Sequence, residues 1–280
     1  AALAPDGSID ATYAVLNEAG MLKPWMISLI KASWYQRFGR ALERQILPGQ
    51  TLHLVLRKRF IDDEVREAIA AGALQVLMVG GGFDTLCMRL AAEYPDVCFV
   101  ELDHPPTHRS KIGALERLDA ARSNLHLQGV DLGEQSLATF LAQAPFWKMD
   151  AKSVVVAEGV LMYLNEAEVV AFLNAVRGTC AAGSRVLATY IFEEGLSRDG
   201  FGWLGGLLRG FLKVVGEPFR WGVDEKGIEP FLAARGFRLL GDAERFDLHR
   251  RYVAPARHEA WPVARFERVV AAEVAYSSSP

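Results

Sequence analysis

Residues 75–104 constrain this chain most, because they join two apolar strand patterns through a glycine turn and a helix. QVLMV is a short apolar run typical of a buried parallel strand, and it leads directly into Gly80-Gly81-Gly82. A helical pattern follows Asp84-Thr85, and a second apolar run ends in Glu101 and Asp103. A strand, a glycine turn, a helix and an acidic residue about 20 positions later form the pattern of a nucleoside-cofactor site.

The turn itself favours S-adenosylmethionine over a dinucleotide. A dinucleotide fingerprint reads G-x-G-x-x-G and leaves backbone amides facing a pyrophosphate at a helix N-terminus. Here Gly80 and Gly82 are followed by Asp84, with no third glycine. A carboxylate repels a pyrophosphate but accepts hydrogen bonds from an ammonium group, such as that of S-adenosylmethionine, so the turn predicts a methyltransferase. A tight turn without a ligand is the plainer alternative, although three successive glycines cost backbone entropy that such a turn need not lose.

Further acidic residues follow strands of the same predicted sheet, where a switch-point fold binds its ligand. Alternation places Glu101 and Asp103 on one face of their strand, either to bind ribose hydroxyls or as a solvated strand end. Asp131 and Leu132 follow the third strand and could hold adenine or form a turn. Glu158 follows the fourth strand among apolar neighbours, which suits a surface glutamate poorly, so we expect it at the cationic end of the cofactor.

Two other segments carry candidate functional side chains. Tyr163 could donate a hydrogen bond to a substrate, face the sulfonium, or simply pack in its turn. Arg57 opens the stretch 57–63, which we expect to place cations just before a helix. The natural partner of such an arginine is a carboxylate group of a cofactor or substrate, and a solvated charge cluster is the alternative. Because Lys58 and Arg59 follow, the register of the arginine stays open.

From residue 75 onward, strand-like runs alternate with amphipathic helical patterns, which predicts an α/β fold with a Rossmann-like, seven-stranded, doubly wound sheet. The strand-like runs are 75–79, 97–102, 124–130, 153–157, 185–192, 237–240 and 249–254, and the main helical patterns are 105–121, 134–142 and 166–180. The last two runs are joined by GDAERFDL, which is too short for a parallel crossover, so we expect an antiparallel last strand. Asn165 and Glu168 resemble a capping box at a helix start.

Two blocks stand outside this alternation. Residues 1–70 are mostly helical in pattern, and residues 193–223 are rich in glycine and aromatic residues. We therefore divide the chain into a helical cap over 1–70 and a methyltransferase domain over 71–280, with a lid insertion at about 193–223. Either block could cover the pocket, or simply cover hydrophobic sheet surface. Residues 201–216 are too short and too interrupted by glycines and cations to span a membrane.

Composition limits the remaining choices. With 280 residues, 51% of them hydrophobic, the chain can bury a large core as one elaborated domain. A net charge of -3 argues against a nucleic-acid partner. Cys87, Cys98 and Cys180 have no metal-ligand spacing and are expected to be reduced thiols of a cytoplasmic protein, in agreement with an N-terminus that shows no secretory signal pattern. The six histidines are scattered, so we predict no metal site.

Taken together, the motifs resemble the leucine carboxyl methyltransferase family of class I S-adenosylmethionine-dependent O-methyltransferases, in particular its bacterial small-molecule and polyketide branch. The resemblance covers residues 57–165 well and 217–254 loosely. It is carried, in order, by Gly80-x-Gly82-x-Asp84-Thr85, Glu101 to Pro105, Asp131-Leu132 and Ala157 to Leu164.

The resemblance implies S-adenosylmethionine as the cofactor and assigns its contacts. It implies that Arg57 binds the carboxylate, Gly80 and Gly82 the methionine part beside Asp84, Asp103 the ribose, Asp131 and Leu132 the adenine, and Glu158 the amino group, with Tyr163 as the catalytic candidate. We expect methyl transfer to a carboxylate or acidic hydroxyl of a small-molecule acceptor. The alternatives are a protein C-terminal carboxyl methyltransferase, as among eukaryotic members of the family, a non-catalytic S-adenosylmethionine-binding module, and an NAD-dependent oxidoreductase.

Overall fold

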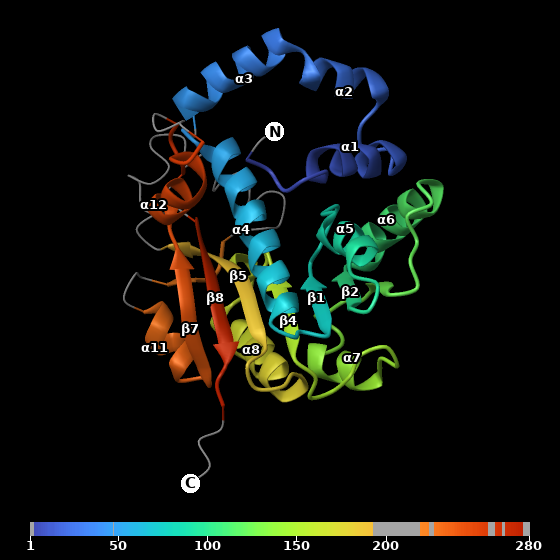
Figure 1. Ribbon diagram of the computed structural model, residues 1–280, viewed down its shortest axis with the longest axis vertical. Helices are drawn as coiled ribbons and strands as arrows, with labels where there is room; N and C mark the ends of the chain where they lie inside the picture. Colours follow the sequence, from blue (N-terminus) through green and yellow to red (C-terminus); the bar gives the residue numbers. More distant parts are fainter. Residues whose placement is uncertain are drawn as a thin grey trace.

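A central sheet organises the computed structural model, which describes residues 3–46, 48–192, 219–223, 227–256, 261–264 and 267–276. The eight strands run in the order β3-β2-β1-β4-β5-β8-β7, with β6 paired to β5 (Figure 1). Strands β1 to β5 are parallel, whereas β8 is antiparallel to both β5 and β7. The strands are β1 (Gln75–Val79), β2 (Cys98–Asp103), β3 (Leu125–Gly129), β4 (Ser153–Ala157), β5 (Arg185–Phe192), β6 (Gly222–Val223), β7 (Phe237–Ala243) and β8 (Glu267–Val274).

Helices cover both faces of this sheet, because neighbouring side chains of each strand point to opposite faces. On β1, Val76 and Met78 pack under α4 (Gln50–Ala70), α5 (Leu86–Glu93) and α6 (Pro105–Arg117). Leu77 and Val79 pack against α7 (Leu137–Gln143), α8 (Glu166–Thr179) and α11 (Ile228–Ala233). The α/β doubly wound fold expected from the sequence is therefore confirmed, with one short additional strand, β6.

The predicted antiparallel last strand is confirmed, but its predicted position at 249–254 is wrong. The run 249–254 is helical and forms η3 (His249–Val253), directly after α12 (Arg245–Leu248), which a capping box between Glu244 and Asp247 begins. The antiparallel strand is instead β8, inserted between β5 and β7. The physical reason is burial: nearly all of β8 is inaccessible to solvent, whereas the 249–254 run exposes Arg250 and Arg251.

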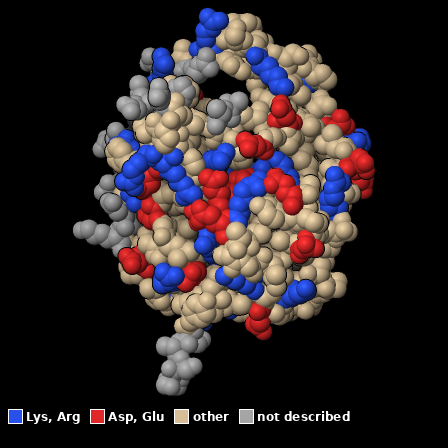
Figure 2. Space-filling model, viewed as in Figure 1, with Lys and Arg blue, Asp and Glu red and all other residues tan. Residues whose placement is uncertain are grey.

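Four helices precede the sheet: α1 (Ser8–Glu18), α2 (Pro24–Lys31), α3 (Ser33–Ile46) and α4. The stretch 57–63 lies within α4 and not before a helix, because α4 begins at Gln50, after Gly49 in the left-handed conformation. The charged face of α4 forms ion pairs across the molecule, such as Arg66 with Glu93, and charged side chains gather over this helix (Figure 2).

Helices α2 and α3 form an arch above the rest of the molecule (Figure 1), and Figure 2 shows an opening beneath it. We call these two helices the α2–α3 arch. Its large side chains do not cover the sheet, since none of its described side chains is buried. The exposed ones are Trp25, Trp34, Tyr35, Phe38 and Leu42.

Part of the second predicted lid lies outside the described residues, which leave out 193–218 and with them the stretch 201–216. At the end of this block, Trp221 is buried and packs against Tyr190 and Phe231. None of the helices in the described ranges is long and apolar enough to cross a membrane.

All three cysteines are free, as expected from their spacing, and two of them are buried. Burial is the main reason that the pKa of the Cys87 thiol lies well above its ordinary value, with a further contribution from the nearby charge of Glu101. Because a thiolate is the reactive form of cysteine, Cys87 is an inert core residue.

Candidate functional site

The glycine turn after β1 combines left-handed backbone at two glycines with a close approach at one of them. Gly80 has a φ of 67°, and a Cβ atom there would lie 2.6 Å from Cγ2 of Val160. Gly82 has a φ of 53°, but a Cβ atom there would meet nothing within 4 Å. The turn thus needs glycine for its backbone at both positions, and it is open to a ligand at Gly82.

Asp84 follows this turn and lies two residues before α5. Its Oδ1 accepts a hydrogen bond from the amide of Leu86 at 2.6 Å. Its Oδ2 is paired with the ammonium group of Lys58. Burial opposes ionisation of Asp84, but the charge of Lys58 and these hydrogen bonds outweigh it and lower the pKa of the carboxyl group.

The two acidic residues of β2 have different surroundings. The Asp103 carboxylate accepts hydrogen bonds from the amides of Gly82 and His104, so it faces the glycine turn. Glu101 is buried beneath the turn and paired with Lys111. Burial raises the pKa of Glu101 to about 7 against the opposing charge of Lys111. Asp103 is therefore placed for a ligand, whereas Glu101 supports the turn from below.

Glu158 follows β4 and joins a set of charged side chains. Arg57 donates from Nε to Oε1 of Glu158 at 2.7 Å and from Nη1 to both carboxylate oxygens of Glu267, at 2.6 and 2.7 Å. Glu267 begins β8 and also lies 3.1 Å from Nε2 of His53. Arg59 instead pairs with Asp63, at 3.0 Å. The structure thus selects Arg57 over Arg59 as the arginine at this edge of the sheet.

We call Asp84, Glu158, Glu267, Arg57, Lys58 and His53 the charged cluster. Burial opposes ionisation of Glu267, but hydrogen bonds and charges from His53 and Arg57 outweigh it and lower its pKa to about 2. Burial likewise works against the charge of Arg57, and its two carboxylate partners raise its pKa despite this. Glu267 and Arg57 are therefore held ionised by each other at neutral pH.

Asp131 and Leu132 complete the row along the edge. Asp131 accepts a hydrogen bond from the amide of Gly133 at 2.8 Å and lies 3.5 Å from Nε2 of His104. Leu132 is exposed. In the order of neighbouring strands, the predicted site residues are Asp131 after β3, Asp103 on β2, the glycine turn after β1 and Glu158 after β4. Because neighbouring strands lie about 4.8 Å apart, this row spans roughly 14 Å.

A cavity of about 290 Å³ adjoins the charged cluster. Its walls come mainly from α1, α4 and the start of α5, and they are mostly apolar, with residues such as Ile9, Leu54 and Ile61. Lys58, Asp84 and Glu158 also line it. A small apolar molecule in this cavity would therefore lie directly beside the carboxylates of the cluster.

Tyr163 lies elsewhere. It ends the short 3-10 helix η1 (Leu161–Tyr163) and packs near Phe219, with ring centroids 5.8 Å apart, beside the buried Met162 and Ile191. It is not among the residues that line the cavity. Its catalytic role stays a prediction.

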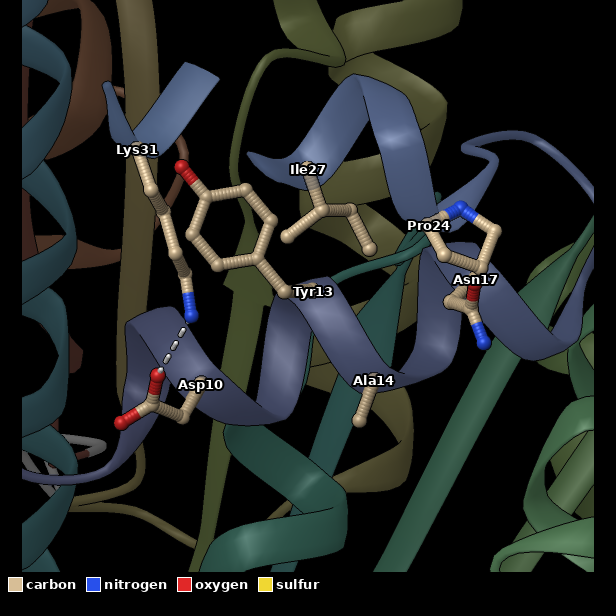
Figure 3. Close-up of a pocket in the computed structure, with 7 residues that line it drawn as sticks. All are labelled: Asp10, Tyr13, Ala14, Asn17, Pro24, Ile27 and Lys31. Carbon is tan, nitrogen blue, oxygen red and sulfur yellow. Dashed lines mark ion pairs between the residues drawn. The ribbon is translucent and has the colours of Figure 1, made fainter. Parts of the chain in front are cut away.

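A second hollow, of about 340 Å³, lies between α1 and α2 (Figure 3). Tyr13 and Ile27 face each other across it, and Lys31 lies 3.6 Å from Asp10 at its side. It contains none of the predicted site residues. Within the described ranges, no group of His, Cys, Asp or Glu side chains has an arrangement that could hold a metal ion.

Three residues at this edge were missed from the sequence. Glu267 and Lys111 carry no local signal, because their partners are distant along the chain. His53 does carry one, since it precedes Arg57 by four positions and so lies on the same side of a helix. Recognising residues 50–70 as one helix would have brought His53 and Arg57 together.

Comparison with known proteins shows the family of this chain. The family described as "Leucine carboxyl methyltransferase" matches residues 9–177, more than half of the chain. The chain belongs to the leucine carboxyl methyltransferase family. Its asparagine capping box at Asn165 and Glu168, with hydrogen bonds of 3.0 and 2.7 Å, lies within the matched region and confirms that sequence prediction.

Two similar proteins bear the name "Putative S-adenosyl-L-methionine-dependent methyltransferase". The one from Streptomyces avermitilis is 30% identical over 136 residues, covering 48% of this chain and 46% of the relative. The one from Saccharopolyspora erythraea is 31% identical over 203 residues, covering 69% of this chain and 66% of the relative. The chain thus spans about half the length of the first of these relatives and about two thirds of the second.

A solved structure supports the fold. The crystal structure of a DUF574 family protein from Streptomyces avermitilis superposes with a TM-score of 0.63 at 14% identity, covering 94% of this chain and 96% of that one. At this identity the likeness concerns the fold alone.

Proposed function

We propose that this protein is an S-adenosylmethionine-dependent O-methyltransferase whose acceptor is a carboxylate or acidic hydroxyl of a small molecule. The row of groups at the carboxyl ends of β3, β2, β1 and β4 carries the proposal. Carboxylates at Asp84 and Glu158 suit an ammonium group and oppose the pyrophosphate of a dinucleotide. Family membership and the names of the relatives point the same way.

The residues along the row match the parts of the cofactor in order. In this assignment the adenine lies at the β3 end, the ribose at β2, the methionine part at the glycine turn and the ammonium group near β4. Nε and Nη1 of Arg57 already donate hydrogen bonds to Glu158 and Glu267. Nη2 has no hydrogen-bond partner among the described residues, so Arg57 would bind the cofactor carboxylate through Nη2. The full set is Arg57, Gly80, Gly82, Asp84, Asp103, Asp131, Leu132 and Glu158.

S-Adenosylmethionine supplies a methyl group on a sulfonium centre, which an oxygen nucleophile can take by in-line displacement. A carboxylate acceptor is already ionised at neutral pH, so the protein need only orient it and exclude water. A phenol, with an unperturbed pKa of about 10, would also need a base to take its proton. Tyr163 is our candidate for a hydrogen bond to the acceptor or contact with the sulfonium.

The cavity beside Asp84 and Glu158 favours a small acceptor over a protein chain terminus. It measures about 290 Å³ and has mainly apolar walls. Such a space suits a compact apolar molecule with one polar end.

Calorimetric titration with S-adenosylmethionine, S-adenosylhomocysteine and NAD tests the cofactor. Wild type should bind the first two and not NAD, and Asp103→Ala should lower the affinity about a hundredfold, because it removes a charged acceptor of ribose hydrogen bonds. Asp96→Ala, at an exposed aspartate just before β2, is the matched control. Binding of NAD alone would overturn the proposal. Labelled methyl transfer to a panel of carboxylic acids, with the matching alcohols for comparison, then tests the acceptor class, and preference for neutral alcohols would contradict it.

A further inference from the structure

Lys58 occupies an unusual place in the charged cluster. It follows Arg57 on α4, its Nζ contacts Oδ2 of Asp84, and it lies 3.3 Å from Oε1 of Glu158. These are the two carboxylates that we assign to the ammonium group of the cofactor. A cation of the protein therefore already stands where a cation of the ligand is expected.

The two cations are chemically alike. A lysine side chain and the amino group of an amino acid both present a compact ammonium with three hydrogen-bond donors. Asp84 and Glu158 are only 14% and 9% exposed, and a buried carboxylate is stabilised by a cation close to it. Burial disfavours the charged form of Lys58, but Asp84 and Glu158 outweigh it and raise the pKa of the ammonium group.

Lys58 differs from its neighbour Arg57 because its side chain is more exposed and has room to move. The Arg57 side chain is 13% exposed and is held by two carboxylates. The Lys58 side chain is 40% exposed and lines the cavity of about 290 Å³. Its flexible stem can turn the ammonium group toward solvent with no movement of the α4 backbone.

We propose that Lys58 stands in for the ammonium group of the cofactor in the free protein and is displaced from Asp84 when the cofactor binds. The inference rests on the proposed function. In the free protein Lys58 contacts both carboxylates, and its charge lowers the pKa of Asp84 against the effect of burial. On binding, the cofactor ammonium replaces it as the partner of Asp84, and the Lys58 ammonium group turns toward solvent.

Lys58 therefore lowers the affinity of the site for a ligand that carries the amino-acid end. It does not change the affinity for a ligand that lacks this end. A nucleoside that carries the amino-acid end must break the Lys58 contacts, whereas a nucleoside that lacks this end leaves them in place. Replacing Lys58 by a neutral residue should therefore strengthen binding of the first kind of ligand alone.

The experiment is calorimetric titration of the full chain with S-adenosylhomocysteine and with 5′-methylthioadenosine, which lacks the amino-acid end. Lys58→Met should bind S-adenosylhomocysteine about tenfold more tightly than wild type, because charged hydrogen bonds no longer compete with the ligand. Its affinity for 5′-methylthioadenosine should not change. Arg59→Met is the matched control, since Arg59 pairs with Asp63 on the same helix, and it should change neither affinity.

The outcomes separate the two proposals. If wild type binds S-adenosylhomocysteine but Lys58→Met binds it equally or more weakly, the stand-in role is overturned and the methyltransferase proposal stands. If no variant binds it, both are overturned. Circular dichroism verifies folding. Should Lys58→Met fail to fold, Lys58→Gln takes its place, because glutamine keeps a hydrogen-bond donor for Asp84. Its affinity for S-adenosylhomocysteine should be roughly threefold higher than that of wild type. An equal or lower affinity would again overturn the stand-in role.

Discussion

The charged cluster and the α2–α3 arch place their side chains in opposite surroundings: the cluster buries paired charges, and the arch exposes aromatic rings. Cluster residues are drawn from distant parts of the chain, as with His53 and Glu267, which lie 214 positions apart. The arch consists of one continuous segment, in which Trp34 and Phe38 are 63% and 64% exposed. Buried charges require fixed partners, whereas exposed aromatic side chains require none. Stability should therefore depend strongly on the cluster and weakly on the arch.

Glu267→Gln should have the largest effect. It should lower the free energy of unfolding at pH 7 by about 3 kcal/mol, because Arg57 and His53 lose a buried anion. Since the pKa of Glu267 is lowered to about 2 from its ordinary 4.5, its stabilisation is complete above pH 4.5 and is lost as the pH falls toward 2. Urea denaturation between pH 2 and 7 should show a flatter acid limb for the variant.

Glu273→Gln, on the same strand, is the control for that experiment. Glu273 pairs with Arg238, which is 65% exposed, so its removal should cost less than about 1 kcal/mol. An equal loss of unfolding free energy in the two variants would contradict the expectation that the charged cluster contributes more to stability than an exposed ion pair.

Gly80→Ala should come next, with a loss of about 2 to 3 kcal/mol. The backbone conformation opposes a side chain at Gly80, and the added Cβ would approach Val160 to 2.6 Å. Thermal unfolding measures the loss. In a Val160→Ala background, the part of the stability loss that comes from the contact with Val160 should disappear, and the part that comes from the backbone conformation should remain. An unchanged loss in that background would show that the contact with Val160 is unimportant.

Arg57→Lys should have a moderate effect on binding. It keeps the charge but loses the planar fork of donors, so affinity for S-adenosylhomocysteine should fall about tenfold. Arg59→Lys, remote from the cluster, should leave the affinity unchanged. The reverse pattern in calorimetry would mean that the arginine register is wrong.

The smallest effect is expected in the arch. The double replacement Trp34→Ser and Phe38→Ser should change the free energy of unfolding by less than about 0.5 kcal/mol, because both side chains are exposed. Leu56→Ala on α4, at a fully buried position, should cost about 2 to 5 kcal/mol in the same urea series. Comparable losses in both would show that the arch packs against other surfaces in solution.

Much of the fold was predictable because it depends on local patterns. The runs 75–79, 153–157 and 185–192 coincide with β1, β4 and β5, since buried parallel strands are continuous apolar runs between turn signals. The position of the last strand was predicted wrongly, because in the run 249–254 only Tyr252 and Val253 favour a strand and they stand beside two arginines. The helix start at Glu244 and the apolar run 267–274 together carried the correct information.

The site also contains residues that the sequence predicts and residues that it does not. The residues that follow strands could be proposed in advance, because parallel strands bring their carboxyl ends to one edge. The interior of the charged cluster could not, because pairing depends on which side chains the fold makes neighbours. Arg57 and Arg59 are equivalent in the sequence, yet the rotation of α4 directs one toward Glu158 and the other toward Asp63.

By itself, the sequence determined the doubly wound sheet, the glycine turn and the row of acidic groups, since each rests on short-range periodicity and backbone sterics. Only the tertiary structure decided that Glu267 and His53 join Arg57, that Lys58 lies between Asp84 and Glu158, and that the aromatic side chains of the arch stay exposed. Charges separated by many residues interact only when folding removes the water between them, and that burial is a property of the whole chain.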